Sequence, residues 1–291
     1  MLYTLQNDRL TVTVRDKGAE LFGITDNAGT QYLWQGDPAY WPDRAINLFP
    51  FVGRVFEQVY THEGRTFRAG THGFLRNETL TAKQTDRTEI SFSLADNERT
   101  RAQYPFAFRL TVDYRLVGST LAVSYTVENT DPHTLIFGIG GHPGFNVPPG
   151  GEGRFEDWYL QFENLTGAKQ ILFSPTALLT DEAPPFAAKN DRLPLRHALF
   201  DNDAIVLKNA GAAVTLASDA SKKSIRVTYP DFPYIGFWHT NKTDAPFVCI
   251  EPWASLPGRQ GVTEDLSSKP EMTHLAPGKT KTFAFTVEIG F

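Results

Sequence analysis

The chain has 291 residues, and 41% of them are hydrophobic, which is enough to bury a large core. Its formal net charge is only −5, without a basic block or an acidic tail, and this argues against nucleic acid and anionic membranes as partners. The single cysteine, Cys249, excludes an intramolecular disulfide and any CxxC metal or redox site. No apolar stretch approaches the roughly 18 residues that span a bilayer, and no signal peptide is evident. These features predict a cytoplasmic protein.

Alternation of apolar and polar residues is the dominant pattern along the chain, and it is typical of half-buried strands. β-branched and aromatic residues fill these segments, as a pleated surface prefers. Turn residues separate them, and Val117-Gly118-Ser119-Thr120 predicts a hairpin between two of the segments. The clearest predicted strands cover residues 10–14, 90–94, 110–114, 121–127, 225–229 and 283–287.

Helical patterns are scarce. Residues 96–104 predict a short helix that ends before Pro105, and residues 37–45 predict another turn or two of helix. The proline-rich segment 180–200 predicts a long surface loop. Because strands and helices do not alternate, a doubly wound sheet is disfavoured, and we expect an all-β fold: one large antiparallel β-sandwich domain over residues 1–291.

Two polar side chains interrupt apolar runs in an unusual way. His142 follows the apolar run 135–139 and Gly140-Gly141, where we expect a strand to break into a turn. Glu251 ends the apolar run 248–250 and is followed by Trp253. A histidine and a glutamate beside a flat indole form an acid/base pair that suits proton transfer on a sugar.

Arg54 and His72 also stand in glycine-flanked segments. Arg54 follows the apolar run 48–53, and a guanidinium there is costly to bury without a partner. Structural explanations stay open: each histidine as a satisfied core residue, Arg54 in an ion pair, and Trp34, Trp238 and Trp253 as core fillers. The sequence contains no HxH, HExxH or clustered cysteines, so we expect no metal site, and it contains no GxSxG elbow.

Seven segments together resemble the aldose 1-epimerase (galactose mutarotase-like) superfamily, most closely its LacX-type branch. The resemblance runs nearly end to end, and its specificity lies in the order and spacing of the motifs. They are residues 18–21, 32–37, 48–54, 72–76, 141–146, 249–253 and Pro277-Gly278. It implies a supersandwich fold and an enzyme that interconverts the α and β anomers of a free hexose. It implies no cofactor, and a small sugar as the partner. A closed sandwich with polar strand edges is compatible with a monomer or a weak dimer.

The resemblance also implies roles for individual residues. His142 matches the general acid and Glu251 the base, which we expect on opposite sides of a pyranose-sized hollow, charged as imidazolium and carboxylate. Such a pair gives a bell-shaped pH profile. The residues expected to bind substrate are Arg54, His72, Arg76, Asp203 and Trp253, with Asp203 as the best match for an aspartate that binds sugar hydroxyls.

Two positions depart from the mutarotase pattern: Glu57 stands where the family has Asn, and Gly144 where it has Tyr. The preferred sugar therefore cannot be transferred from the family. Arg54 and Arg76 together would suit a phosphate, which leaves a hexose-phosphate 1-epimerase as one alternative. A carbohydrate-binding protein without turnover is another. A glycoside hydrolase would need a second carboxylate facing Glu251, and no convincing partner is seen.

Overall fold

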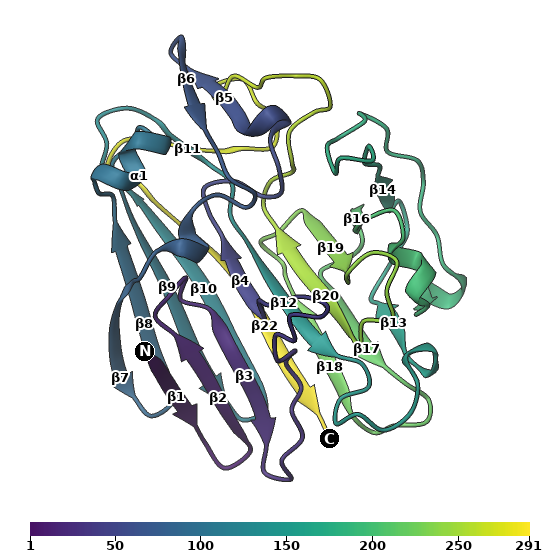
Figure 1. The fold of residues 1–291 in the computed structure, drawn as a ribbon. Coiled ribbons are helices and arrows are strands. Elements are labelled where there is room, and N and C mark those ends of the chain that lie inside the picture. The colour runs from purple at the N-terminus through teal and green to yellow at the C-terminus, as the bar shows by residue number, and fades with distance from the viewer.

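The computed structural model describes all 291 residues, and it is almost entirely β (Figure 1). Every pair of neighbouring named strands is antiparallel, as in Thr120–Asn129 against Phe108–Val117, where residues 120 and 117 start a continuous register. The predicted all-β antiparallel sandwich is therefore confirmed. No helix has the length and apolar character that crossing a membrane requires.

Two large sheets form the body of the molecule. The larger has nine strands in the order β15-β13-β17-β18-β22-β10-β9-β8-β7, and the smaller has six in the order β14-β16-β19-β20-β12-β4. The nine are β7 (Thr81–Asp86), β8 (Glu89–Ala95), β9 (Phe108–Val117), β10 (Thr120–Asn129), β13 (Tyr159–Phe162), β15 (Arg192–Pro194), β17 (Ala213–Ala217), β18 (Ser224–Thr228) and β22 (Thr280–Gly290). The six are β4 (Ala45–Leu48), β12 (Gly140–Asn146), β14 (Lys169–Ile171), β16 (Ile205–Lys208), β19 (Tyr234–Trp238) and β20 (Phe247–Trp253).

Smaller elements complete the chain. A three-stranded sheet, two two-stranded sheets and short helices lie around the body. The strands are β1 (Leu2–Gln6), β2 (Leu10–Arg15), β3 (Leu21–Asp26), β5 (Val59–His62), β6 (Arg65–Arg68), β11 (Leu135–Phe137) and β21 (Thr273–Leu275). The helices are α1 (Glu98–Gln103) and the 3₁₀ turns Phe56–Gln58, Leu75–Asn77, Phe155–Asp157, Lys189–Asp191 and His197–Phe200.

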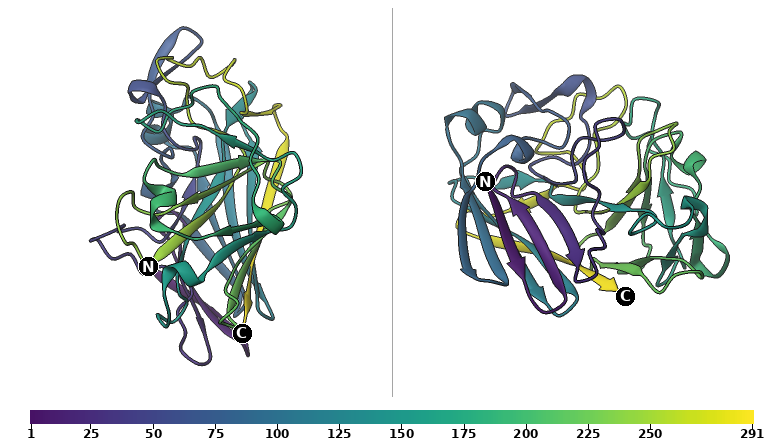
Figure 2. Two further views of the ribbon diagram at one scale, coloured as in Figure 1. Left: turned by 90° about the vertical axis from the view of Figure 1, so that its right-hand side faces the viewer. Right: turned by 60° about the horizontal axis from the view of Figure 1, so that its bottom comes forward.

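The core lies between two layers. The nine-stranded sheet forms one layer, and the six-stranded sheet and β1–β3 cover it side by side (Figures 1 and 2). Alternate residues of the strands point inward, so fully buried residues alternate with partly exposed ones along β2 and β10. Contacts between the layers include the Tyr3 ring against Phe92 and Phe162 against Phe237. One buried cluster runs through both parts of the sandwich.

The six predicted strands are all present, as β2, β8, β9, β10, β18 and β22, and so is the predicted hairpin, β9–β10. The predicted helix is α1, which begins after Asn97 in a capping box with Thr100. The second helical prediction is wrong: residues 37–45 form a turn and an irregular segment that lead into β4. The segment 180–200 is mostly loop, with β15 and two 3₁₀ turns within it.

Neither site strand ends where the sequence predicted. Gly140-Gly141 does not make a turn; it begins β12, and His142 lies inside that strand. Likewise β20 continues past Glu251 to Trp253. The glycines of β12 do not form the predicted turn. Their missing side chains instead leave room for aromatic rings packed against the sheet.

Candidate active site

His142 and Glu251 lie side by side at the centre of the six-stranded sheet. In the register of β12 and β20, Gly140 pairs with Trp253 and Gly144 with Cys249, which places His142 opposite Glu251. On the outer sides, Ile46 of β4 pairs with His142, and Gly236 of β19 pairs with Glu251. The acid/base pair is thus built on regular strands rather than on loops.

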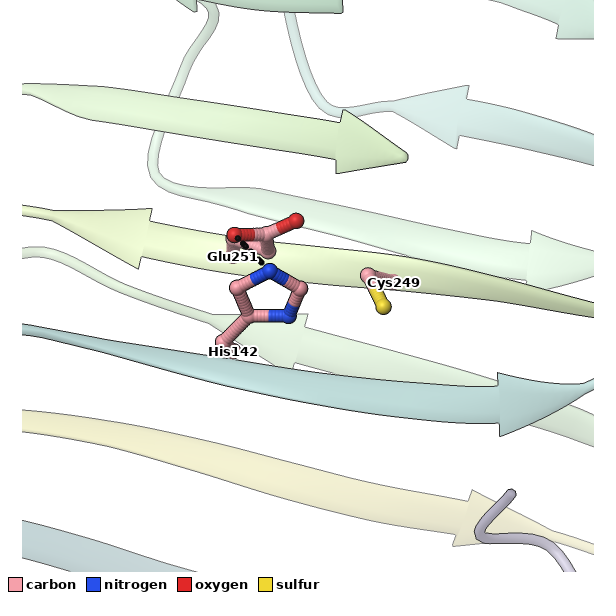
Figure 3. A group of neighbouring side chains, drawn as sticks. All are labelled: His142, Cys249 and Glu251. Carbon is pink, nitrogen blue, oxygen red and sulfur yellow. Dashed lines mark ion pairs between the residues drawn. The ribbon is translucent and has the colours of Figure 1, made fainter. Parts of the chain in front are cut away.

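The two side chains touch directly. Nε2 of His142 is 3.2 Å from Oε2 of Glu251, and the side chains are only 8% and 1% exposed (Figure 3). Nδ1 of His142 and Oε1 of Glu251 have no hydrogen-bond partner. The expectation of two groups on opposite sides of a hollow is therefore wrong. Because cross-strand neighbours point to the same face of a sheet, the two side chains lie side by side on one face of the six-stranded sheet.

Glycines on the same face make room for two indoles. A Cβ at Gly140 would lie 3.1 Å from Cδ1 of Trp253, and a Cβ at Gly144 would lie 3.1 Å from Cζ3 of Trp41. Trp41 packs on the imidazole of His142, with ring centroids 4.9 Å apart. A side chain at position 144 would thus crowd the Trp41 ring.

The pair opens into a cavity of about 410 Å³. This volume lies within the range typical of small-molecule sites. Every residue for which the sequence predicted a role lines it, although the residues come from β12, β20 and three separate loops. They are Arg54, His72, Arg76, His142, Asp203, Glu251 and Trp253.

The two arginines of the cavity differ in their partners. Arg76 is held by an ion pair with Asp43. The guanidinium of Arg54 donates only to the carbonyl oxygen of Thr176, at 3.2 Å, and forms no ion pair. Arg54 is therefore the cation that is free to meet an incoming polar group.

His72 is fixed by its backbone. Its φ of 64° lies in the left-handed region, and the next residue, Gly73, has φ 72°. A Cβ at Gly73 would come within 2.2 Å of the carbonyl oxygen of Phe49, so only glycine fits there. Nδ1 of His72 accepts a hydrogen bond from the N–H of Gly53 at 3.1 Å. A neutral His72 therefore carries its proton on Nε2.

Burial and charge control protonation in the site. Desolvation, with Arg76 and Arg54 nearby, lowers the pKa of His72 to about 3. Desolvation also lowers the pKa of His142 and raises the pKa of Glu251. Burial thus disfavours two separate charges, while the direct contact favours one proton between the two groups. The pair holds a single shared proton, either as neutral imidazole and carboxylic acid or as imidazolium and carboxylate.

The sequence reasoning missed several residues of the cavity. Trp41 was assigned to a helix that does not form, and Asn241 follows β19 in a loop without a motif. Of the tryptophans for which a core-filling role stayed open, Trp238 lines the cavity, whereas Trp34 is buried against Phe247 outside it. The presence of tryptophan was readable in the sequence, but which ring reaches the cavity depends on the packing.

Comparison with known proteins identifies the family. Residues 1–288 match the family described as aldose 1-epimerase. The chain belongs to the aldose 1-epimerase family. It is 33% identical to chromosomal protein LacX of Lactococcus lactis subsp. lactis, over 99% of each chain.

Solved structures of the same kind superpose closely. A galactose mutarotase related enzyme from Lactobacillus acidophilus has a TM-score of 0.94 at 33% identity, covering 100% of this chain and 98% of that one. A galactose mutarotase-like protein from Lactobacillus casei has a TM-score of 0.94 at 31% identity, covering 99% and 100%. A putative aldose 1-epimerase from Escherichia coli K12 shares the fold, with a TM-score of 0.79 at 17% identity over 100% and 99% of the chains. The resemblance seen in the motifs is confirmed, including its LacX-type character.

Proposed function

We propose that this protein is an aldose 1-epimerase that interconverts the α and β anomers of a free hexose. The observation that carries the proposal is the buried contact between His142 and Glu251 at the wall of a sugar-sized cavity. A binding protein has no need for a matched acid and base that share a proton away from water. Membership of the family supports the same reaction.

Anomer exchange requires the C1–O5 bond to break, C1 to rotate, and the ring to close again. Glu251 takes the proton from the O1 hydroxyl while His142 gives a proton to the ring oxygen, and the roles reverse on closure. O1 and O5 are both bonded to C1, so an acid and a base that lie side by side can reach both oxygens. Sugar entry would redirect the shared proton from the His142–Glu251 contact to the substrate.

The remaining residues hold the sugar. Two arginines, Arg54 and Arg76, offer hydrogen-bond donors for sugar hydroxyl groups, and Asp203 offers an acceptor. Because His72 is neutral, with its proton on Nε2, it offers one further N–H donor. Trp253 donates its indole N–H to Oε2 of Glu251 at 3.2 Å, which orients the carboxylate. Trp41 and Trp238 offer aromatic faces for the C–H side of the ring.

Polarimetry on freshly dissolved α-D-glucose and α-D-galactose tests the proposal directly. We expect the protein to accelerate the approach to the equilibrium rotation, and Glu251→Gln to abolish the acceleration. If no aldose is turned over but calorimetry detects sugar binding, the protein is a carbohydrate-binding protein and the enzymatic proposal fails.

One observation favours a second candidate, a hexose-phosphate 1-epimerase. The unpaired guanidinium of Arg54 stands in the cavity together with Arg76, and two guanidiniums suit a phosphate group. The ion pair of Arg76 with Asp43 argues the other way, since it already uses one of the charges. Anomer exchange on glucose 6-phosphate, followed by NMR beside free glucose, separates the two substrates.

A further inference from the structure

A cysteine lies next to the acid/base pair and takes no part in the proposed reaction. Cys249 precedes Glu251 by two residues on β20, so both side chains leave the strand on the same face. His142 joins them from the neighbouring strand (Figure 3). One ligand-type atom from each of Cys249, His142 and Glu251 lies within 4.8 Å of the other two, and all three residues are buried.

Two of the three side chains, Glu251 and His142, each have a polar atom without a hydrogen-bond partner. Oε1 of Glu251 and Nδ1 of His142 are buried and have no hydrogen-bond partner. An unpartnered buried polar atom is costly, so such atoms in native proteins usually meet a ligand, an ion or ordered water. The Glu251 side chain is 1% exposed and that of His142 is 8% exposed, which leaves few routes to such a partner other than the cavity.

We propose that Cys249, His142 and Glu251 form a binding site for one Zn²⁺ ion, and that the ion inhibits the protein. A thiolate, an imidazole and a carboxylate are the three ligand types that zinc prefers, at about 2.3, 2.0 and 2.1 Å. Tetrahedral ligands at those distances are about 3.5 Å apart. The widest pair in the cluster must therefore close by about 1 Å, while the His142–Glu251 pair is already near this spacing.

The ion would take the place of the shared proton. A Zn²⁺ ion bound to a ring nitrogen of His142 and a carboxylate oxygen of Glu251 would block both the acid and the base. The shared proton and the thiol proton of Cys249 would both pass to solvent on binding. A fourth ligand position would be left for water. Zinc and sugar should therefore compete. Motif searches miss this arrangement because its ligands come from two strands, without HxH or CxxC spacing.

Metal binding can be measured without any sugar. Calorimetry of the metal-free protein with ZnCl₂ should show one ion per chain, and Cys249→Ala or Cys249→Ser should weaken binding by about tenfold or more. Co²⁺ serves as a spectroscopic probe: the unmodified protein should show a near-ultraviolet thiolate-to-cobalt charge-transfer band, and both variants should lose it. The cobalt spectrum of the unmodified protein decides the role of the thiol even if a variant folds poorly.

Equal zinc affinity in the cysteine variants, or a cobalt complex without the thiolate band, would overturn the proposal, as would failure to bind one ion per chain. If the protein proves to be an epimerase, the Cys249→Ala variant should keep its activity and resist inhibition by Zn²⁺. The binding measurements stand apart from that result, so the zinc site and the enzymatic function can fail independently.

Discussion

His142 and Glu251 share one proton in a buried contact, so the protonation of each side chain depends on the other. Replacing Glu251 by Gln or His142 by Asn keeps the approximate size and removes the ability to transfer that proton. General acid or base catalysis contributes about 10²–10⁴-fold, so we expect kcat to fall at least a hundredfold in each variant. Polarimetry measures the rates, and circular dichroism checks the fold. A loss below about tenfold would remove that residue from the mechanism.

The shared proton also determines the pH dependence. Burial raises the pKa of Glu251 and lowers the pKa of His142, so the pair keeps a single proton over a wide middle range. At low pH the pair gains a second proton and loses its base; at high pH it loses the shared proton and has no acid. We expect a bell-shaped profile of kcat/KM, measured by polarimetry. A flat profile would contradict the pair's role, and a single limb centred near 6.5 would indicate an ordinary solvated histidine instead.

The close approach of Trp41 to Gly144 can be tested by substitution. A Cβ at position 144 would lie 3.1 Å from the Trp41 ring, 3.2 Å from Cβ of Trp34 and 3.3 Å from the carbonyl oxygen of Arg44. We expect Gly144→Ala to destabilise the protein by about 1–3 kcal/mol through overpacking. The change would also push Trp41 off His142 and lower kcat. Urea unfolding and polarimetry measure the two effects.

A smaller ring should relieve the clash. In the double variant Gly144→Ala/Trp41→Phe, we expect the loss of stability to be smaller than the sum of the single losses, with a coupling of about 0.5–3 kcal/mol. Gly70→Ala is the matched control, because its added Cβ meets nothing closer than 3.8 Å. Strict additivity would show that Trp41 does not occupy the space above Gly144.

The chemical types of the site were predictable from the sequence, but their arrangement was not. His142, Glu251 and Arg54 stood out because charged groups beside apolar runs are costly without a purpose. Their direct contact could not be predicted, since it depends on which strands become neighbours and in which register. Trp41 was missed because a loop delivers it, and a loop residue carries no periodicity from which its direction can be read.

At the scale of elements, β4 ties the site to the core behind it. Asn47 follows Ile46 and points to the opposite face, where its side chain accepts a hydrogen bond from the hydroxyl of Tyr125 at 2.7 Å and donates to the carbonyl of Ala19. Tyr125 belongs to β10 of the nine-stranded sheet, so this bond joins the two layers directly beneath the site strands.

Tyr125→Phe should therefore weaken the sandwich. The change leaves a buried oxygen of Asn47 without a partner, and we expect a loss of about 1–3 kcal/mol in the free energy of unfolding. Tyr159→Phe is the matched control, because its hydroxyl bonds the exposed Asp219; its effect should stay within about 0.5 kcal/mol. Urea denaturation measures both. Equal losses in the two variants would contradict an inter-layer tie.

The alternating strands were the part of the fold that the sequence predicted best. Long amphipathic strands such as β9 and β10 carry a two-residue period that is independent of tertiary context. β12 lacks this signal because it is buried on both faces and contains three glycines. Glycine and proline in a sequence favour turns, so the pattern predicted a break in the segment that forms the centre of the site.

For the whole molecule, the desolvated imidazoles of His72 and His239 predict sensitivity to acid. Desolvation lowers the pKa of His72 to about 3 and that of His239 to about 4. Below the ordinary histidine pKa of 6.5, the unfolded chain binds protons that the folded chain refuses, so stability falls as pH falls. The His142–Glu251 pair adds little to this pH dependence of stability. Between pH 4.5 and 6.5 it holds about one proton in the folded chain and about one in the unfolded chain.

Each proton that only the unfolded chain binds changes the free energy of unfolding by up to about 1.4 kcal/mol per pH unit in this range. We expect urea unfolding between about pH 6.5 and 4.5 to show a slope that approaches two protons, and His239→Asn to reduce it by about half. Stability that is constant over this range would mean that the two imidazoles accept protons in the folded state.

The proton-transfer pair belongs to the sheet, whereas the groups around the cavity mouth come from the loops that carry Trp41, Arg54, His72, Asp203 and Asn241. The strands thus hold the pair, and the loops supply the residues packed around it. We expect exchange of these loops between relatives to change which small molecule binds while the His142–Glu251 contact is kept, because the register of β12 and β20 sets that contact.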